Sequence, residues 1–169
     1  MPKIKKRRFG EMREFEHVFE WTDYNDENPF PKGSWKTDIF KNENPITLEL
    51  ACGKAEYSIG LAKLHPNKNL IGVDIKGNRM WVGADKAISE GIENVRFLRT
   101  YIDHLDRFFD ENEVSEIWIL FSDPYIKKER KRLTSPKFLT LYRKIAKPGT
   151  VINLKTDSDL LYDYSLEVK

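Results

Sequence analysis

The residues whose types and spacing predict chemistry gather around one stretch, Thr47 to Asp74, with the sequence TLELACGKAEYSIGLAKLHPNKNLIGVD. It reads as a short buried strand carrying Glu49, a small-residue loop around Gly53, an amphipathic helix, and a second apolar strand ending on Asp74. A βαβ unit of this kind binds its ligand over the carboxyl ends of its strands. Asp74 closes the second strand where a ribose would offer its two hydroxyls to a carboxylate. The stretch therefore predicts a cofactor site.

The loop does not fit a pyrophosphate. The dinucleotide fingerprint needs glycines at fixed offsets so that phosphates can approach a helix N-terminus, and here Ala51, Gly53 and Glu56 occupy the three places. Glu56 would place a negative charge beside the phosphates. The stretch resembles instead motif I of the Rossmann-like S-adenosylmethionine methyltransferases, whose cofactor carries a sulfonium and an ammonium that suit an acid such as Glu49. A βαβ crossover for another ligand stays open as the alternative.

A second candidate site follows the apolar run 116–121. Asp123 comes directly after this predicted central strand, and the basic run Lys127 to Arg132 follows. In an open α/β sheet the end of that strand lies beside the first strand's loop, so Asp123 would reach the cofactor. An acid beside a methyl donor, with cations beyond it, suits a nucleic acid substrate. The alternatives are an ordinary Asp-Pro turn and a solvated charged face.

The elements that must position these residues alternate along the chain. We expect strands at 47–51, 69–75, 95–99, 116–121 and 150–154, and helices at 56–64, 78–90, 102–109, from Pro136, and at 157–167. Gly91 is placed to end one helix and Pro148-Gly149 to turn the chain into the last strand. Alternating strands and helices predict a doubly wound, mainly parallel α/β sheet.

Residues 1–45 form a predicted N-terminal arm packed on a domain of residues 46–169, within one globular domain overall. The arm is basic at first, and no clean period appears in it. The segment Lys3 to Arg8 would either contact nucleic acid phosphate or form a solvated tail. The arm's aromatic residues are expected to pack against the main domain; they are Phe15, Phe19, Trp21, Tyr24, Phe30, Trp35 and Phe40.

Composition narrows the class of protein. The chain has 169 residues, 33% of them charged, and a net charge of +2, so local charge clusters matter more than the total. A single cysteine, Cys52, suits a reducing compartment. No apolar run reaches membrane-spanning length and no secretory signal is visible, so we expect a cytoplasmic protein. His17, His65 and His104 are scattered, which argues against a metal site. The sequence does not indicate the oligomeric state.

From about Lys32 onward the chain resembles the bacterial tRNA (guanine-N7)-methyltransferase family. Four segments carry the resemblance in order: NPITLELACGKAEY, NLIGVDIKGNR, IWILFSDPYIKKERKRLTSPKFL and LKTDSDLLYDYSLEV. The resemblance implies a Rossmann-like S-adenosylmethionine methyltransferase fold. It also implies S-adenosylmethionine as cofactor, tRNA as partner, and methyl transfer to the N7 nitrogen of a variable-loop guanosine.

The resemblance also assigns residue roles. Cofactor contacts fall on Glu49, Gly53, Asp74, Tyr101 and Asp123, and substrate or RNA contacts on Lys127, Arg130, Lys131, Arg132 and Asp157. Tyr101 stands where the family has an acid near the adenine, and stacking on the adenine is its expected contact. Asp123 is the expected catalytic residue. Because guanine N7 already has a free lone pair, Asp123 would orient the base and stabilise the developing charge, without acting as an obligatory base.

The chain also departs from the family. Ala51 and Ala55 stand where the family often has glycine, and a positive φ at Ala55 would strain the loop. Ser122 replaces a proline, Tyr125 replaces a tryptophan, and the loop after Asp123 is shorter than usual and lacks a histidine. The family continues past the last predicted helix with a Thr-x-x-Glu segment and further strands. We therefore expect a shortened form with an unpaired fifth strand and weak tRNA binding. The alternatives are a non-catalytic RNA- or cofactor-binding relic and a methyltransferase of this fold acting on another substrate.

Overall fold

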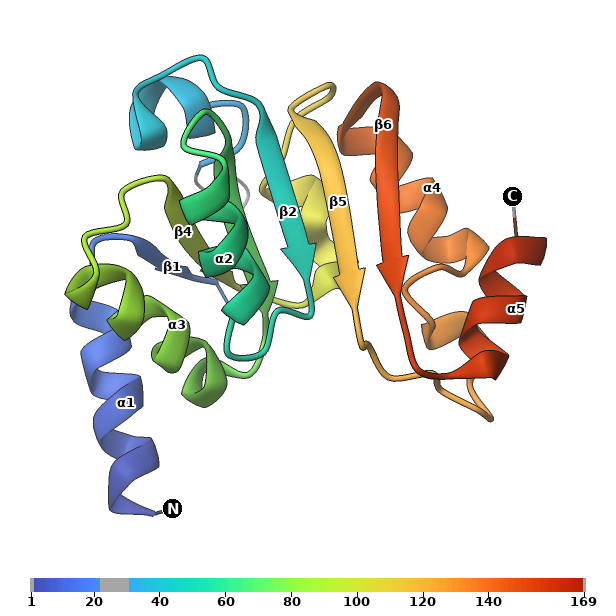
Figure 1. The fold of residues 1–169 in the computed structure, drawn as a ribbon, viewed down its shortest axis with the longest axis horizontal. Helices are drawn as coiled ribbons and strands as arrows, with labels where there is room; N and C mark the ends of the chain where they lie inside the picture. Colours follow the sequence, from blue (N-terminus) through green and yellow to red (C-terminus); the bar gives the residue numbers. More distant parts are fainter. Residues whose placement is uncertain (1, 22–30, 169) are drawn as a thin grey trace.

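The computed structural model describes residues 2–21 and 31–168. Six parallel strands form one sheet in the order β1-β4-β3-β2-β5-β6. The strands are β1 (Val18–Glu20), β2 (Ile46–Leu50), β3 (Asn69–Asp74), β4 (Val95–Arg99), β5 (Val114–Leu120) and β6 (Ala146–Lys155). The α-helices are α1 (Lys3–Glu14), α2 (Glu56–Leu64), α3 (Gly77–Ser89), α4 (Pro136–Ile145) and α5 (Asp159–Glu167), and the short helices are η1 (Trp35–Phe40), η2 (Ile102–Arg107) and η3 (Glu129–Lys131). The predicted doubly wound α/β fold is confirmed (Figure 1).

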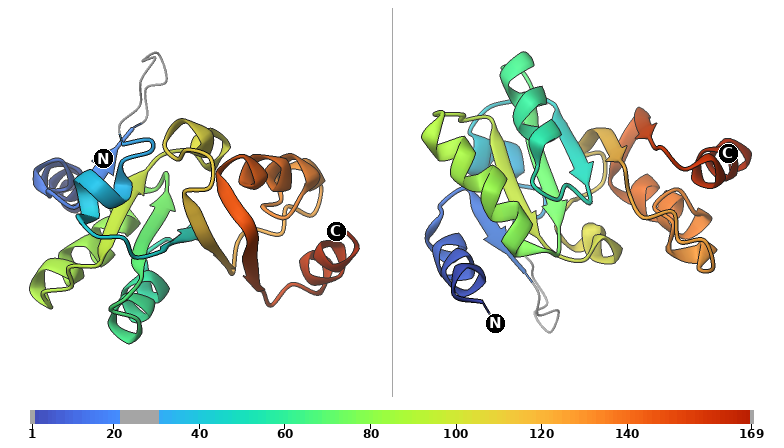
Figure 2. Two further views of the ribbon diagram at one scale, coloured as in Figure 1. Left: turned by 90° about the horizontal axis from the view of Figure 1, so that it is seen from above. Right: turned by 60° about the horizontal axis from the view of Figure 1, so that its bottom comes forward.

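Helices cover both faces of the sheet (Figure 2, left). On one face, α1, α2 and α3 share an apolar cluster that includes Met12, Ile59, Met80 and Phe97. On the other, η1, η2 and α4 share a larger cluster that includes Trp35, Phe108 and Tyr142. The sheet is therefore buried on both sides over β2 and β3, where every residue from Ile46 to Val73 within the two strands is buried. This burial fixes the two strands whose carboxyl ends carry the predicted cofactor residues.

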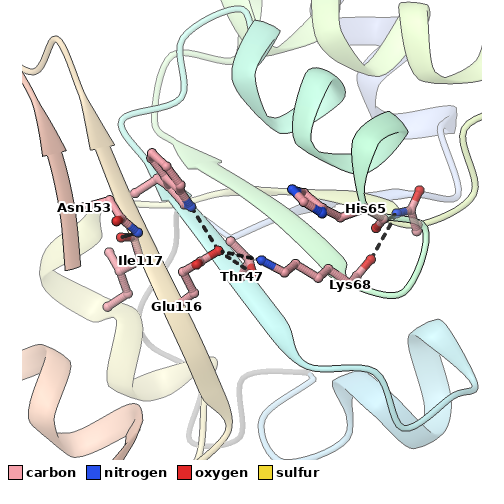
Figure 3. Close-up of polar contacts among 8 residues, drawn as sticks. Thr47, His65, Lys68, Glu116, Ile117 and Asn153 are labelled. Atoms are coloured by element: carbon pink, nitrogen blue, oxygen red, sulfur yellow. Dashed lines mark hydrogen bonds and ion pairs between the residues drawn. The ribbon is translucent and has the colours of Figure 1, made fainter. Parts of the chain in front are cut away.

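The strands β2 and β5 are also tied by a polar cluster (Figure 3). Glu116 Oε1 accepts hydrogen bonds from Thr47 Oγ1 at 3.3 Å and from Trp118 Nε1 at 3.0 Å. Lys68 Nζ lies 3.4 Å from the same oxygen, and both of these side chains are only partly exposed. This cluster adds side-chain contacts to the backbone pairing of Thr47 with Glu116, so it reinforces the register of β2 on β5.

The N-terminal region contains elements that periodicity does not reveal. Helix α1 buries only Met12, and β1, which pairs with β4, has three residues. Trp35 is fully buried, stacks on Phe109 with ring centroids 5.2 Å apart, and donates from Nε1 to the Phe108 carbonyl at 2.7 Å. Tyr24 and Phe30 lie outside the described residues.

Strand β6 lies at one edge of the sheet and, within the described part of the chain, pairs only with β5. It begins earlier than the predicted 150 because Ala146 already pairs with Val114 before the register shifts. Pro148 and Gly149 lie within this irregular start, where Gly149 has φ of 82°. The expected turn is thus a bulge inside the strand. No helix of the described residues is both long and apolar enough to cross a membrane.

Candidate functional site

A pocket of about 480 Å³ opens where the four central strands end. Gly53 follows β2, Asp74 ends β3, Tyr101 follows β4 and Asp123 follows β5, and all four line this pocket. Because parallel strands finish at one edge of the sheet, Gly53 and Asp123, which are 70 positions apart in the sequence, meet here. The right-hand view of Figure 2 brings this carboxyl edge toward the reader. The structure thus gathers most of the cofactor residues that the sequence indicates.

The loop between β2 and α2 is tightly curled. Ala51, Gly53 and Ala55 have φ values of 56°, 56° and 59°, so all three adopt the left-handed conformation. Hydrogen bonds from Cys52 N to Val73 O and from Ala55 N to Cys52 O close the curl. Left-handed backbone costs an L-residue roughly 1–2 kcal/mol, so the two alanines store strain beside the pocket. Ala55 thus has the positive φ that we expected to strain this loop.

Asp74 is held by backbone donors. The Gly53 N–H donates to Asp74 Oδ2 at 2.9 Å, while the N–H groups of Ile75 and Lys76 donate to Oδ1 at 2.7 and 3.0 Å. The carboxylate is therefore fixed at the pocket wall, and of its two oxygens only Oδ2, which accepts a single hydrogen bond, keeps a lone pair free. Since the Gly53 N–H already binds a carboxylate, it is not available to a cofactor phosphate.

Glu49 lies on β2, buried against α2, and does not line the pocket. Its Oε1 accepts hydrogen bonds from the Ser58 backbone N–H at 3.0 Å and from the Ser58 hydroxyl at 2.7 Å. Burial raises the pKa of Glu49 to about 7. The Ser58 hydrogen bonds oppose that shift, and the charges of Asp74 and Glu56 add to it. Glu49 is thus poised to gain charge when a cation is placed near it.

Ser58 and Cys52 are the small residues around this carboxylate. The sequence analysis did not identify Ser58 as a site residue. The only feature that could have indicated it is a polar hydroxyl among the buried residues of α2. Cys52 is buried, and burial raises the pKa of its thiol well above the ordinary range. A neutral buried thiol is a poor nucleophile, so Cys52 has the properties of a packed residue.

The wall after β4 contains an ion pair that the sequence did not indicate. Tyr101 is half exposed, and Asp103 pairs with Lys137 Nζ at 2.5 Å. Burial opposes the ionisation of Asp103, but the hydrogen bond and charge of Lys137 outweigh it, so the pKa of Asp103 is lowered. The pair links the β4 loop to the start of α4 and borders the pocket.

Asp123 follows β5 on a strained loop. Phe121 and Tyr125 have φ values of 51° and 44°, and the Tyr125 N–H donates to Asp123 Oδ1 at 2.9 Å. Asp123 is exposed to the pocket while its orientation is fixed by this backbone bond. Strain of this kind is typical of functional loops.

The basic loop separates into exposed and buried cations. Lys127, Arg130 and Lys131 are exposed, and Lys131 lines the pocket. Arg132 is only 6% exposed: its Nε donates to Pro124 O at 2.8 Å and its Nη2 to Ile126 O at 3.4 Å. The structure therefore does not place Arg132 among the surface cations, because its guanidinium holds the loop from within.

Asp157 follows β6 at the same edge of the sheet and is exposed. Neither Asp157 nor Lys127 lines the pocket. Within residues 2–21 and 31–168, no three His, Cys, Asp or Glu side chains are grouped as metal ligands.

Solved structures that align with this chain include methyltransferases. A structure described as an antibiotic related methyltransferase aligns with a TM-score of 0.63 and 21% identity, over 78% of this chain and 70% of the other. The 16S rRNA (adenine(1408)-N(1))-methyltransferase from Catenulisporales acidiphilia aligns with a TM-score of 0.54 and 22% identity, over 65% of this chain and 51% of the other. At these identities the match concerns the fold, which is that of the Rossmann-like methyltransferases.

Sequence comparison defines the family. Residues 43–169 match the model of a family described as putative methyltransferase. The tRNA (guanine-N(7)-)-methyltransferase of Bacteroides fragilis is 51% identical over 98% of this chain, and that of Christiangramia forsetii is 48% identical over 97%. The chain therefore belongs to the family that includes these tRNA (guanine-N(7)-)-methyltransferases. It spans 66% of the length of the Bacteroides fragilis relative and 75% of the Christiangramia forsetii one.

Proposed function

We propose that this chain binds S-adenosylmethionine in the carboxyl-edge pocket and transfers its methyl group to guanine N7 in the variable loop of tRNA. The observation that carries the proposal is the pair of carboxylates, Asp74 and Asp123, which are both held by backbone hydrogen bonds and both line one pocket. Relatives with about half of their aligned residues identical are named tRNA (guanine-N(7)-)-methyltransferases. A tRNA substrate implies that the protein acts in the cytoplasm.

The residues present fit this cofactor better than a dinucleotide. Asp74 Oδ2 has a lone pair free for a ribose hydroxyl, and half-exposed Tyr101 offers a ring face to an adenine. Glu49, with its pKa near 7, is available to balance the ammonium through the curled loop. The pocket volume is within the range of small-molecule sites, roughly 300–1,000 Å³. Two acids and an occupied loop N–H disfavour a pyrophosphate.

The chemistry asked of the protein is modest. The bound cofactor supplies a methyl group on a sulfonium; the bond from guanine N7 to carbon forms as the bond from sulfur to carbon breaks. The electron pair of that bond stays on sulfur. No proton leaves N7 before attack, so Asp123 need not act as a base. Held by the Tyr125 N–H, its carboxylate orients the base and stabilises the positive charge that appears on the guanine ring.

The substrate side of the pocket is cationic. Exposed Lys127, Arg130 and Lys131 are suited to tRNA phosphates, and Asp157 to a hydrogen bond with the nucleoside. Arg132 supports the same loop from within and is assigned a positioning role. Because phosphate contacts release counterions, tRNA affinity should fall steeply with salt.

Calorimetric titration of the chain with S-adenosylmethionine and, separately, with NAD tests the cofactor assignment. We expect saturable binding of S-adenosylmethionine alone. The variant Asp74→Asn should weaken this binding about tenfold or more, since a ribose hydroxyl loses a charged acceptor. The matched variant Asp157→Asn, at the same edge but outside the pocket, should leave it unchanged. Binding of NAD, or of neither ligand, would contradict the proposal.

A further inference from the structure

Helix α1 carries a concentration of positive charge that the methyl-transfer pocket does not use. Its twelve residues include six cations and two acids, whereas the whole chain has a net charge of only +2. The remainder of the chain is therefore net negative. Lys3, Lys5 and Lys6 are exposed, and within the described residues none of these three lysines forms an ion pair.

The helix is anchored by its second half. Arg8 lies over the Trp81 ring at 4.6 Å from its centroid, and the indole N–H of Trp81 donates to Glu11 Oε2 at 2.6 Å. Met12 is fully buried, and the Phe9 ring lies under the Arg99 guanidinium at 4.7 Å. The first half of the helix has no comparable packing: even Ile4 is 56% exposed.

The lysines project beyond the edge of the sheet that holds the pocket. Arg8 Nη1 lies 3.4 Å from Asn78 Oδ1, Glu11 contacts Trp81, and the His17 ring contacts Ala84 O, so α1 runs in the same direction as α3. Helix α3 starts at this carboxyl edge, just after β3. Because a helix rises about 1.5 Å per residue, Lys3 lies about 7.5 Å further along the helix axis than Arg8. Figure 1 shows the N-terminus of α1 well past the strand tips.

The electrostatics of this helix end are unfavourable for the free protein. The N-terminus of a helix carries partial positive charge, and cations there are destabilising. The first turn of α1 has no acid, and no side chain caps it. The lysines therefore raise an already positive potential that a bound polyanion would neutralise.

The charge continues to the pocket. Lys76 and Arg79, at the start of α3, line the pocket on the side of α1, and Lys131 lines it from the basic loop after β5. We propose that the exposed first half of α1, through Lys3, Lys5 and Lys6, is a second phosphate-binding surface for the tRNA, on the opposite side of the pocket from the basic loop. This inference rests on the proposed function. It gives the RNA two cationic contacts that straddle the methylated base.

The test is tRNA binding by fluorescence anisotropy over a salt series. The triple variant Lys3→Ala, Lys5→Ala, Lys6→Ala is compared with a control triple, Lys36→Ala, Lys41→Ala, Lys147→Ala. The control removes the same charge from the opposite, amino-end edge of the sheet. We expect the α1 variant to lose about tenfold or more in tRNA affinity, and its salt slope to fall by about two to three, since each phosphate contact contributes roughly 0.9. The control should keep both values within about twofold of the parent chain.

Two further readouts exclude misfolding. Alanine favours helix and removal of these cations relieves the helix end, so the α1 variant should keep its circular dichroism spectrum and its S-adenosylmethionine affinity. Equal losses of tRNA affinity in the two triple variants would overturn the proposal. So would binding of anionic phospholipid vesicles that the α1 substitutions abolish while tRNA binding persists. If the parent chain bound S-adenosylmethionine but no tRNA, the RNA part of the proposed function would fail, and this surface with it.

Discussion

The guanidinium of Arg132 lies 4.5 Å from the ring centroid of Tyr164, so helix α5 supports the loop that carries Asp123. A second contact joins the same two regions: the hydroxyls of Thr134 and Ser165 are 2.6 Å apart. Arg132 also donates to two carbonyls of the loop, so helix α5, which lies outside the pocket, helps to hold the loop that carries Asp123. The residue that sequence assigns to RNA binding thus has a structural partner on α5.

Replacement of Arg132 should loosen the Asp123 loop. Arg132→Ala leaves the Pro124 and Ile126 carbonyls without their donor, which costs roughly 1–3 kcal/mol of unfolding free energy. Methyl transfer should fall about tenfold or more, since positioning is lost. Arg132→Lys should not restore it, because lysine cannot donate to two carbonyls while stacking on a ring. Denaturant unfolding and initial rates measure both effects.

The neighbouring exposed arginine provides the control. Arg130→Ala should leave the unfolding free energy unchanged within about 0.5 kcal/mol, because a surface substitution breaks no buried bond. Its effect should be limited to tRNA affinity. Equal stability losses in the two arginine variants would show that Arg132 has no special role in the loop.

Glu49 should make stability fall with pH. Its folded pKa of about 7 lies above its ordinary value of 4.5, so between these two pH values only the folded state holds the proton. Stability from this group therefore decreases as pH rises through that window, by about 3 kcal/mol in total. Glu49→Gln keeps an acceptor for Ser58 and removes this dependence. It should be more stable than the parent chain at pH 8 and bind S-adenosylmethionine more weakly.

Denaturant unfolding at pH 5 and pH 8 measures the difference. Glu90 serves as the control, because this exposed carboxyl has its pKa lowered by a hydrogen bond from Lys63, the opposite direction. Glu90→Gln should hardly change the pH dependence. Calorimetry adds a second check: the cofactor's ammonium should drive a proton from Glu49, so binding near pH 6 should release a proton to the buffer. Unchanged pH dependence in Glu49→Gln would refute this account of the buried carboxyl.

Gly83 allows the curled loop to approach α3. A Cβ at this position would lie 2.6 Å from Lys54 O and 2.8 Å from Ala55 Cβ. Gly83→Ala should therefore destabilise the chain by roughly 1–3 kcal/mol and weaken S-adenosylmethionine binding. At Gly60, in α2, a Cβ would meet nothing within 4 Å. Gly60→Ala should stabilise the chain by about 0.5–1 kcal/mol, and thermal unfolding of the pair tests the contrast. A stable Gly83→Ala with normal cofactor affinity would contradict it.

The strain at Ala51 should be removable. Ala51→Gly places glycine at φ of 56°, and we expect a net gain of about 0.5–1 kcal/mol after the entropy cost of glycine. The same substitution at Ala62, inside α2, should destabilise the chain by about 1 kcal/mol. Urea unfolding of the two variants gives the signs directly. A loss of stability in Ala51→Gly would show that the alanine methyl contributes more than the left-handed backbone costs.

Sequence predicts the elements with strong apolar periods and misses the weak ones. Helix α2 begins and ends at the predicted residues, Glu56 and Leu64, because its buried face is regular. Helix α1 was not predicted because it buries only one residue and therefore shows no regular apolar face, and β1 is too short to show a period. Strand β6 starts early because Ala146 pairs with Val114 across a bulge, and the local sequence does not predict this pairing.

The candidate site also has a part that the sequence predicts and a part that only the structure reveals. Gly53, Asp74, Tyr101 and Asp123 could be placed together from sequence because parallel strands share one carboxyl edge. The Ser58 contact to Glu49 and the pair of Asp103 with Lys137 arise from tertiary packing. The inward turn of Arg132 has the same origin, since its neighbours in sequence are exposed cations and only the loop's fold distinguishes it. The sequence shows that these residues are cations, but only the structure shows which of them is buried and supports the loop from within.

The central claim is methyl transfer to guanine N7, and one assay tests it. The chain is incubated with tRNA and S-adenosylmethionine labelled on the methyl group, and the tRNA is digested to nucleosides for chromatography. We predict that the label appears in 7-methylguanosine, and that Asp123→Asn lowers the rate by about 10²-fold while S-adenosylmethionine binding persists. Label in another nucleoside, or bound cofactor with no transfer to tRNA, would contradict the account.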